Sequence, residues 1–138
     1  MIMEDLAKTL MKEAGYRYEA MIDAYENQRW SFVVRLSQEC VELTLKAILR
    51  YFCIEPPKWH DVGAIFEQNQ HKFTPLIREK LGDVIKISKE LRKDRELSMY
   101  GDEERGLSSI DLYKEPQATE AKTWAEEIYK LGKEVIRT

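Results

Sequence analysis

The stretch LRKDRELSMYGDEERG, residues 91–106, holds the side chains best suited to recognising or acting on a phosphate. Arg95 is followed, after four intervening residues, by Tyr100, and Gly101 and Asp102 come next. A guanidinium stays protonated at physiological pH and carries only hydrogen-bond donors, so Arg95 can bind an anion. A tyrosine hydroxyl is mostly protonated at neutral pH and an exposed aspartate is a weak base, so this set favours anion recognition over proton transfer. The same stretch is also typical of a helix end, with Gly101 supplying a left-handed cap.

The direction in which Arg95 points bears on both interpretations. On a helix predicted over residues 75–100, Ile77, Val84, Leu91 and Arg95 share one direction. A buried guanidinium without a partner is costly, so we expect Arg95 to meet an acidic group, an anionic ligand or water in a cleft. A structural salt bridge and a ligand contact both remain open.

Further basic residues surround Arg95 on the same predicted helix and could form a strip for phosphate groups. They are Lys86, Lys89, Lys93 and Arg92. Acidic residues interrupt the strip, namely Glu90, Asp94 and Glu96, which favours a solvated face of ion pairs as the alternative. The candidate ligand-binding residues are Arg95, Arg92, Lys89 and Tyr100, and the candidate catalytic residues are Arg95, Tyr100 and Asp102.

The composition favours long amphipathic helices. Charged residues make up 34% of the 138 residues, and there are only 6 Gly and 4 Pro. A chain of this length can bury a sizeable core, so we expect a single domain over residues 1–138. The net charge of −3 gives no global positive field, so any RNA contact needs a local patch.

Hydrophobic periodicity predicts an all-α, up-and-down bundle of four long helices and one short helix. The long helices are predicted over residues 4–28, 30–53 and 75–100 and from Pro116 onward, and the short one over 61–70. Pro56 and Pro57 are expected to end the second long helix, and Thr74 and Pro75 to begin the third. Residues 101–115 are expected to form an acidic loop.

The second long helix carries polar residues among its apolar ones. Ser37 and Thr44 lie on the apolar stripe, where they leave room for close helix packing or bond back to the preceding turn. Glu42 and Lys46 have the spacing of an ion pair. Gln38 and Glu39 could reach a neighbouring helix or a ligand, but a surface role is favoured.

Cys40 and Cys53 are predicted on one helix, about 20 Å apart, which excludes a disulfide between them. We expect two free, buried thiols and, since no Cys/His cluster has metal-ligand spacing, neither a metal nor a cofactor. No signal peptide or membrane segment is expected, which favours a cytoplasmic protein.

The histidines offer little chemistry. His60 precedes the short helix, where Asp61 can cap the first amides, and a positioning role is favoured over catalysis. His71 is expected in an exposed loop. No phosphate-binding loop, dinucleotide-binding turn or nucleophile elbow occurs in the sequence.

The segment SQECVELTLKAILRYFCIEPPKWHDVGAIF, residues 37–66, resembles the HEPN family of small helical prokaryotic domains. Members show a Ser, Gln, Glu and Lys at this spacing in a long second helix, then a Pro-containing turn and a His before a short helix. The matching residues here are Ser37, Gln38, Glu42, Lys46, Pro57 and His60. The resemblance implies a bundle of four or five helices, usually assembled as a homodimer.

The resemblance implies one of two functions. Many HEPN proteins are metal-independent endoribonucleases whose Arg-x4-6-His motifs meet across the dimer. Here Arg95 matches the first position, while Tyr100, Gly101 and Asp102 occupy the slots in which the His could stand. Other members lack the motif and bind nucleotides or proteins, often beside a small nucleotidyltransferase in toxin–antitoxin-like operons. In some of those pairs a Tyr near the motif is nucleotidylated.

Three hypotheses follow. The first is a dimeric HEPN-type module that binds a nucleotide or RNA phosphate through Arg95, Tyr100 and Asp102, with a nucleotidyltransferase as partner protein. The second is an endoribonuclease in which Tyr100 or Asp102 replaces the His. The third is a purely structural dimeric protein in which Arg95 forms an interface ion pair.

Overall fold

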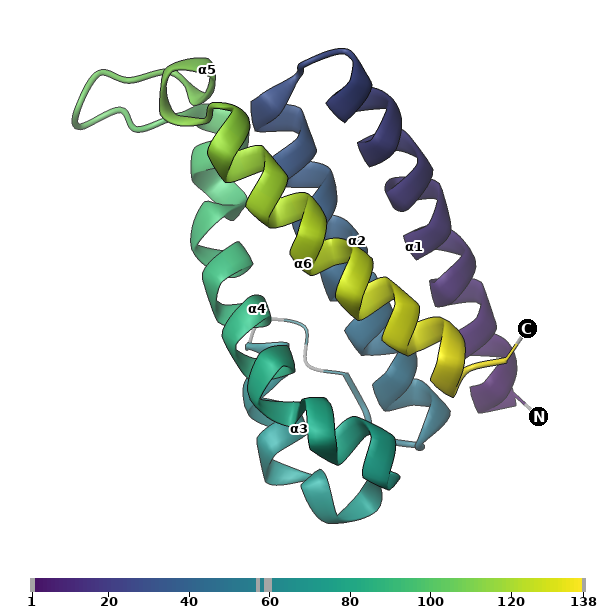
Figure 1. The fold of residues 1–138 in the computed structure, drawn as a ribbon. Coiled ribbons are helices and arrows are strands. Elements are labelled where there is room, and N and C mark those ends of the chain that lie inside the picture. The colour runs from purple at the N-terminus through teal and green to yellow at the C-terminus, as the bar shows by residue number, and fades with distance from the viewer. Residues whose placement is uncertain (1, 57, 59–60, 138) are drawn as a thin grey trace.

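The protein folds as a helical bundle, which confirms the predicted fold class (Figure 1). The computed structural model describes residues 2–56, 58 and 61–137, so Pro57 and His60 lie outside the described residues. The four long helices are α1 (Ile2–Glu26), α2 (Trp30–Tyr51), α4 (Pro75–Tyr100) and α6 (Glu115–Val135). Three short helices join them, α3 (Val62–Gln68), the 3-10 helix η1 (Gln70–Lys72) and α5 (Ser109–Leu112). Over the described ranges there is no strand and no helix long and apolar enough to cross a membrane.

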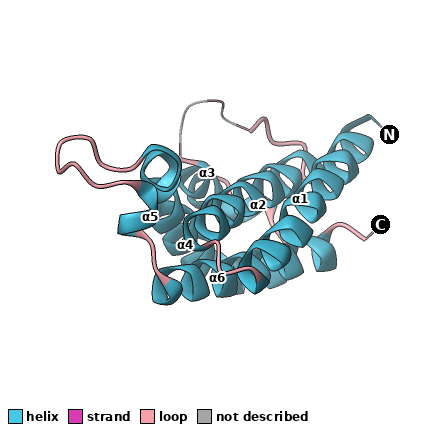
Figure 2. Cartoon of the chain, turned by 90° about the horizontal axis from the view of Figure 1, so that it is seen from above, coloured by secondary structure: helices cyan, strands magenta, loops and turns pink. Residues whose placement is uncertain are grey.

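Helix α2 is the central element of the bundle. It packs against α1, α4 and α6, and the view from above shows it among them (Figure 2). Three consecutive residues, Ala47, Ile48 and Leu49, are all fully buried. Because successive side chains on a helix point about 100° apart, this requires neighbours on several sides of α2. By contrast, α4 buries a single line of residues that includes Ile77, Val84 and Leu91.

The contact between α2 and α6 depends on a glycine. Thr44 is fully buried, and a Cβ atom placed on Gly132 of α6 would overlap the Thr44 methyl group and lie 2.9 Å from the sulfur of Met11. Neither Ser37 nor Thr44 donates its hydroxyl to a carbonyl of the preceding turn. The sequence left open whether these residues allow close helix packing or bond back to the preceding turn, and at Thr44 the structure shows close helix packing.

Helices α1 and α2 each end two residues before their predicted ends, and both ends have the same geometry. Gln28 has φ 58° and Cys53 has φ 60°, both in the left-handed region. The next amides close the turns, Arg29 donating to the Ala24 carbonyl at 2.9 Å and Ile54 to the Leu49 carbonyl at 2.8 Å. These are Schellman-type ends, which usually carry glycine.

The end of α2 corrects two predictions. The helix stops at Tyr51, before the prolines that were expected to end it, because the left-handed Cys53 has already reversed the chain. Cys53 therefore lies outside the helix and is exposed, whereas Cys40 is buried as predicted.

Asp61 fixes the start of α3, as predicted. Its carboxylate accepts hydrogen bonds from the Gly63 amide and the Ser88 hydroxyl, both at 3.0 Å. The second bond joins α3 to α4. At the start of α4, Pro75 occupies the first turn as predicted, but the Thr74 side chain makes no capping hydrogen bond.

The acidic loop predicted over residues 101–115 contains more structure than expected. Ser108 and Asp111 form a reciprocal capping box that begins the short helix α5. Residues 102 and 107 also pair as an isolated antiparallel bridge. The prediction was incomplete because a single helical turn carries no hydrophobic period.

We predict opposite effects for the same substitution at two helical glycines. Gly82→Ala should raise the free energy of unfolding by about 0.5 to 1 kcal/mol, because nothing lies within 4 Å of the added methyl group and alanine favours a helix. Gly132→Ala should lower it by about 1 to 2 kcal/mol, because overlap with Thr44 outweighs the helical gain. Urea unfolding measures both. A gain at Gly132 equal to that at Gly82 would refute the close approach of α2 and α6.

Candidate functional site

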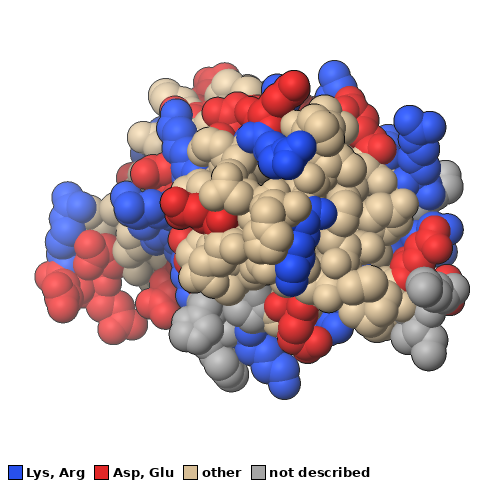
Figure 3. Space-filling view, turned by 90° about the horizontal axis from the view of Figure 1, so that it is seen from below, with Lys and Arg blue, Asp and Glu red and all other residues tan. Residues whose placement is uncertain are grey.

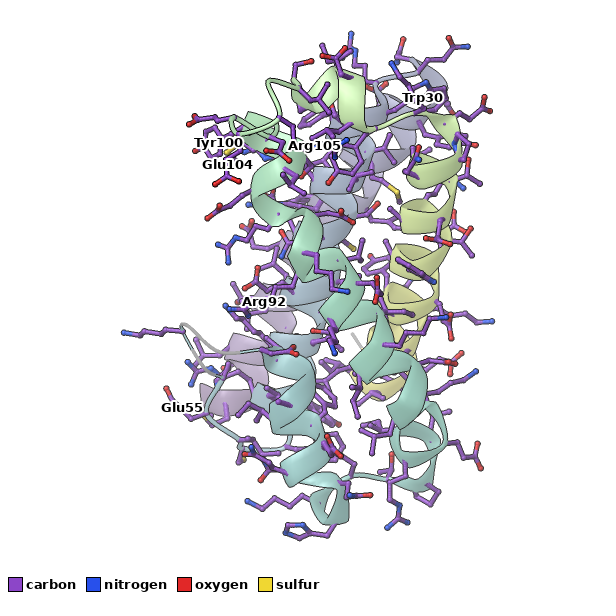
Figure 4. The ribbon with its side chains drawn as sticks, turned by 90° about the vertical axis from the view of Figure 1, so that its left-hand side faces the viewer. Trp30, Glu55, Arg92, Tyr100, Glu104 and Arg105 are labelled. Atoms are coloured by element: carbon purple, nitrogen blue, oxygen red, sulfur yellow. The ribbon has the colours of Figure 1, made fainter. Side chains whose placement is uncertain are left out.

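An open pocket of about 960 Å³ lies where α4 meets the segment that follows it. We call this recess, bordered by residues between 92 and 104, the α4 pocket. Arg92, Arg95, Tyr100 and Asp102 all border it, whereas Lys89 does not. Figure 4 shows Arg92 and Tyr100 on the same side of the molecule. The structure thus brings together four of the five residues singled out in the sequence.

Gly101 turns the chain at the end of α4. Its φ is 76°, and its amide donates to the Leu97 carbonyl at 3.0 Å. A Cβ atom at this position would overlap the carbonyl oxygen of Leu107. Only glycine fits here without strain, so the predicted need for glycine with a positive φ is confirmed. Its ψ of −169° differs, however, from that of the left-handed cap that was predicted.

Residues 101–107 form a segment that projects from the bundle, which we call the arm (Figures 1 and 2). Asp102 and Leu107 exchange two backbone hydrogen bonds, of 2.7 and 2.9 Å. The Asp102 carboxylate also accepts from the Arg105 amide at 3.2 Å. Glu103 and Glu104 lie at the tip and border the α4 pocket. The arm therefore places carboxylates opposite the cations of α4.

Arg95 lies at the edge of the α2/α4 interface. Its side chain is 59% exposed, and its Nη1 atom lies 3.9 Å from Oε1 of Glu42 on α2. Arg95 meets an acidic group, one of the partners expected for it, but it does not lie on the buried face, because the buried line of α4 continues from Leu91 to Ser98 and passes beside it. The contact with Glu42 is long for an ion pair and is made through one guanidinium nitrogen, and the side chain also borders the α4 pocket.

Glu42 is held as a carboxylate. Burial raises its pKa, but the charges of Lys46 and Arg95 and a hydrogen bond from Gln38 outweigh burial, so the pKa lies below its ordinary value. The Gln38 amide donates to Glu42 at 3.1 Å, and Lys46 Nζ lies 3.3 Å from it. The predicted Glu42–Lys46 pair is therefore confirmed. Gln38, by contrast, is only 7% exposed, so its predicted surface role was wrong.

A second recess, of about 370 Å³, runs along α2 beside the α4 pocket. On α2 it is bordered by Gln38, Glu42 and Lys46. Arg95 and Met99 of α4 border both this recess and the α4 pocket. We call it the α2 groove. Three residues of the sequence signature on α2 thus lie next to Arg95, a proximity that spacing along the chain does not indicate.

Charges of both signs line the α4 pocket. Its cations are Arg92, Lys93 and Arg95, and its carboxylates are Glu96, Asp102, Glu103 and Glu104. Acidic side chains also gather on the projecting part of the molecule at the left of Figure 3. The pocket is therefore suited to a ligand that carries both an anionic group and hydrogen-bond donors.

The basic strip predicted along α4 is divided rather than continuous. Lys86 lies over the ring of Trp124 at 5.9 Å, and Lys93 pairs with Glu90 at 3.3 Å. Lys89 is exposed and outside the α4 pocket. The alternative of a solvated face with local partners describes this side of α4 better.

Sequence reasoning missed the contact that anchors the chain after the arm. The Tyr113 hydroxyl donates to the Asp94 carboxylate at 2.7 Å, and Tyr113 is only 6% exposed. Burial raises the pKa of Asp94, as do Glu90 and Glu120, while the bond from Tyr113 lowers it. Asp94 directly precedes Arg95, so this contact fixes the end of α4 to the segment between α5 and α6.

No described histidine lies near Arg95. His71 is exposed in η1, at the opposite end of α4, and His60, for which a positioning role was predicted, lies outside the described residues. Nor do the described parts of the chain contain a group of three His, Cys, Asp or Glu residues that could hold a metal ion.

Comparison with known proteins identifies the family. The model of the HEPN domain matches residues 7–136, which is nearly the entire chain. No curated protein and no solved structure gives a significant match. The chain belongs to the HEPN domain family.

We predict that the contribution of Glu42 to stability depends on pH. Its pKa is lowered by folding, so its stabilising effect is present above the pKa of an unfolded glutamate, about 4.3, and is lost as the pH falls through the folded value. Glu42→Gln should lower the free energy of unfolding by about 1 kcal/mol at pH 7. Urea unfolding of both proteins across the acidic range should show this difference vanish. The control is Glu103→Gln on the arm, and a Glu42 effect that does not change with pH would contradict the prediction.

We also predict that Tyr113→Phe loosens the arm. The substitution leaves the half-buried Asp94 carboxylate without its donor and should cost about 1 to 2 kcal/mol of unfolding free energy. Trypsin cleavage after Arg105 should become faster. Tyr100→Phe is the matched control, because that hydroxyl is exposed. Unchanged stability and cleavage in Tyr113→Phe would refute the anchoring role.

Proposed function

We propose that this HEPN-domain protein binds a nucleotide or an RNA phosphate in the α4 pocket. The observation that carries the proposal is the meeting of Arg92, Arg95, Tyr100 and Asp102 at one open recess. The volume of about 960 Å³ is at the upper end of the range for small-molecule pockets, so a nucleotide or a short stretch of RNA fits.

The cations of α4 supply the phosphate contacts. Arg92 and Arg95 are three residues apart, which places them on neighbouring turns of one face. Guanidinium groups bind phosphate through paired N–H donors, and the long contact of Arg95 with Glu42 leaves such donors for a ligand.

Tyr100 and the arm supply the remaining contacts. The Tyr100 side chain is 71% exposed, so its ring offers a surface on which a base can stack. The carboxylates of Asp102, Glu103 and Glu104 accept hydrogen bonds from base amino groups and ribose hydroxyls. This mixed lining matches a nucleotide better than a bare phosphate ion.

The assembly in the proposal is a homodimer with a nucleotidyltransferase partner in a toxin–antitoxin-like system, as in other members of the family. The exposed hydroxyl of Tyr100 next to the α4 pocket suits a residue that a partner enzyme could nucleotidylate. A protein that stays monomeric at micromolar concentration in light scattering would contradict the dimer.

Two other functions compete with this one. An endoribonuclease needs Tyr100 or Asp102 to take the place of the missing motif His, and both border the pocket beside Arg95. A purely structural role for Arg95 is favoured by its ion pair with Glu42, although that pair lies within one chain.

The test compares wild type, Arg95→Ala and Arg78→Ala with labelled RNA in EDTA, following retention and cleavage on the same samples. We expect retention without cleavage, weakened about tenfold in Arg95→Ala, because a lost phosphate contact costs on the order of 1 kcal/mol or more. Arg78→Ala is the matched control, since Arg78 is an exposed residue at the other end of α4. Cleavage that depends on Arg95 would establish the ribonuclease instead. Absence of any interaction would favour the structural role.

A further inference from the structure

A groove of about 460 Å³ lies between α1 and α6, away from the α4 pocket. We call it the α1/α6 groove. It lies near the end of the bundle where α6 finishes beside the start of α1 (Figure 1). On α1, Lys8 borders this groove and Arg17 borders the α2 groove. The two residues are nine positions apart, so their side chains point in opposite directions from the helix axis. The two recesses therefore open on opposite faces of α1.

The α1/α6 groove concentrates positive charge. Lys8, Lys12 and Lys133 border it, against a single carboxylate, Glu19. Lys8 and Lys12 are four residues apart on one helix face, a like-charge spacing that disfavours the helix. Lys8 also lies 3.5 Å from Glu4, outside the groove. The balance is the opposite of that in the α4 pocket, where carboxylates outnumber cations.

Aromatic rings form part of the groove lining and are held in place. Tyr129 stacks on Tyr18 with ring centroids 4.7 Å apart, and Lys133 Nζ lies 5.5 Å from the Tyr129 ring. Gly15 makes room for Tyr129, because a Cβ atom there would lie 2.9 Å from the Tyr129 hydroxyl. Tyr16 is 51% exposed, so its ring remains accessible.

We propose that the α1/α6 groove is a second ligand site, which takes a nucleoside phosphate. Cations beside exposed aromatic rings are the combination that binds a phosphate and stacks a base. The phosphate would meet Lys8, Lys12 and Lys133, and the base would lie against Tyr16. The groove volume is within the range of small-molecule sites. This site stands independently of the function proposed for the α4 pocket.

The test is calorimetric titration of the full chain with adenosine monophosphate, performed in the Arg95→Ala background so that binding at the α4 pocket is weakened. Lys12→Gln and Tyr16→Ser should each weaken binding about tenfold. Lys12→Arg, which keeps the charge, should stay close to the parent. The matched control is Lys130→Gln, which changes an exposed lysine of α6 outside this groove.

Four outcomes would overturn the proposal. The first is the absence of saturable binding up to about 5 mM, which corresponds to an affinity weaker than about 3 kcal/mol. The second is that Lys130→Gln weakens binding as much as the groove substitutions do, and the third is that Lys12→Gln and Tyr16→Ser leave binding unchanged. The fourth is that inorganic phosphate binds as tightly as the nucleotide. Since the background lacks Arg95, failure here leaves the proposal for the α4 pocket untouched. Circular dichroism of each variant establishes that the helices are intact.

Discussion

The burial of α2 on most of its circumference is the constraint on which the rest of the structure depends. The side of α2 that remains uncovered carries Arg35, Glu39 and Lys46, and Glu42 lies at its margin. Polar chemistry on this helix can therefore occur only along that side, next to α4. Close packing against α6 at Gly132 and against α4 along Leu91 determines which residues of α4 reach the margin, and Arg95 is one of them.

Glu42 gives that margin its electrostatic character. A carboxylate that is largely buried is stable only when its charge is compensated, and here Lys46, Gln38 and Arg95 share that role. Arg95 contributes from 3.9 Å, so it can stabilise the carboxylate and still direct donors outward. The α2 groove and the α4 pocket meet at this residue, which links Gln38, Glu42 and Lys46 on α2 to the end of α4.

The features that repeat along the chain were the ones that sequence could predict. Periodicity located the long helices. The residue types at two helix ends also indicated their roles, since Gly101 permits the positive φ after α4 and the Asp61 carboxylate caps α3. Left-handed helix ends at Gln28 and Cys53 could not be foreseen, because neither residue type prefers that conformation. Tyr113 and Asp94 pair across 19 positions, and their partnership follows from packing rather than from local pattern. For Arg95 the helical wheel indicated the apolar face, but the buried line of α4 passes beside this residue, and its side chain stays largely exposed.

The arm has a thermodynamic consequence of its own. It is closed by two backbone hydrogen bonds between Asp102 and Leu107 and buries no large apolar side chain over residues 101–107. Segments of this kind open locally at a small fraction of the free energy that unfolds the whole molecule. A ligand that contacts both α4 and the arm binds only the closed population, so its apparent affinity is reduced by the closed fraction. Substitutions in the arm can therefore tune the occupancy of the pocket while every contact on α4 stays the same.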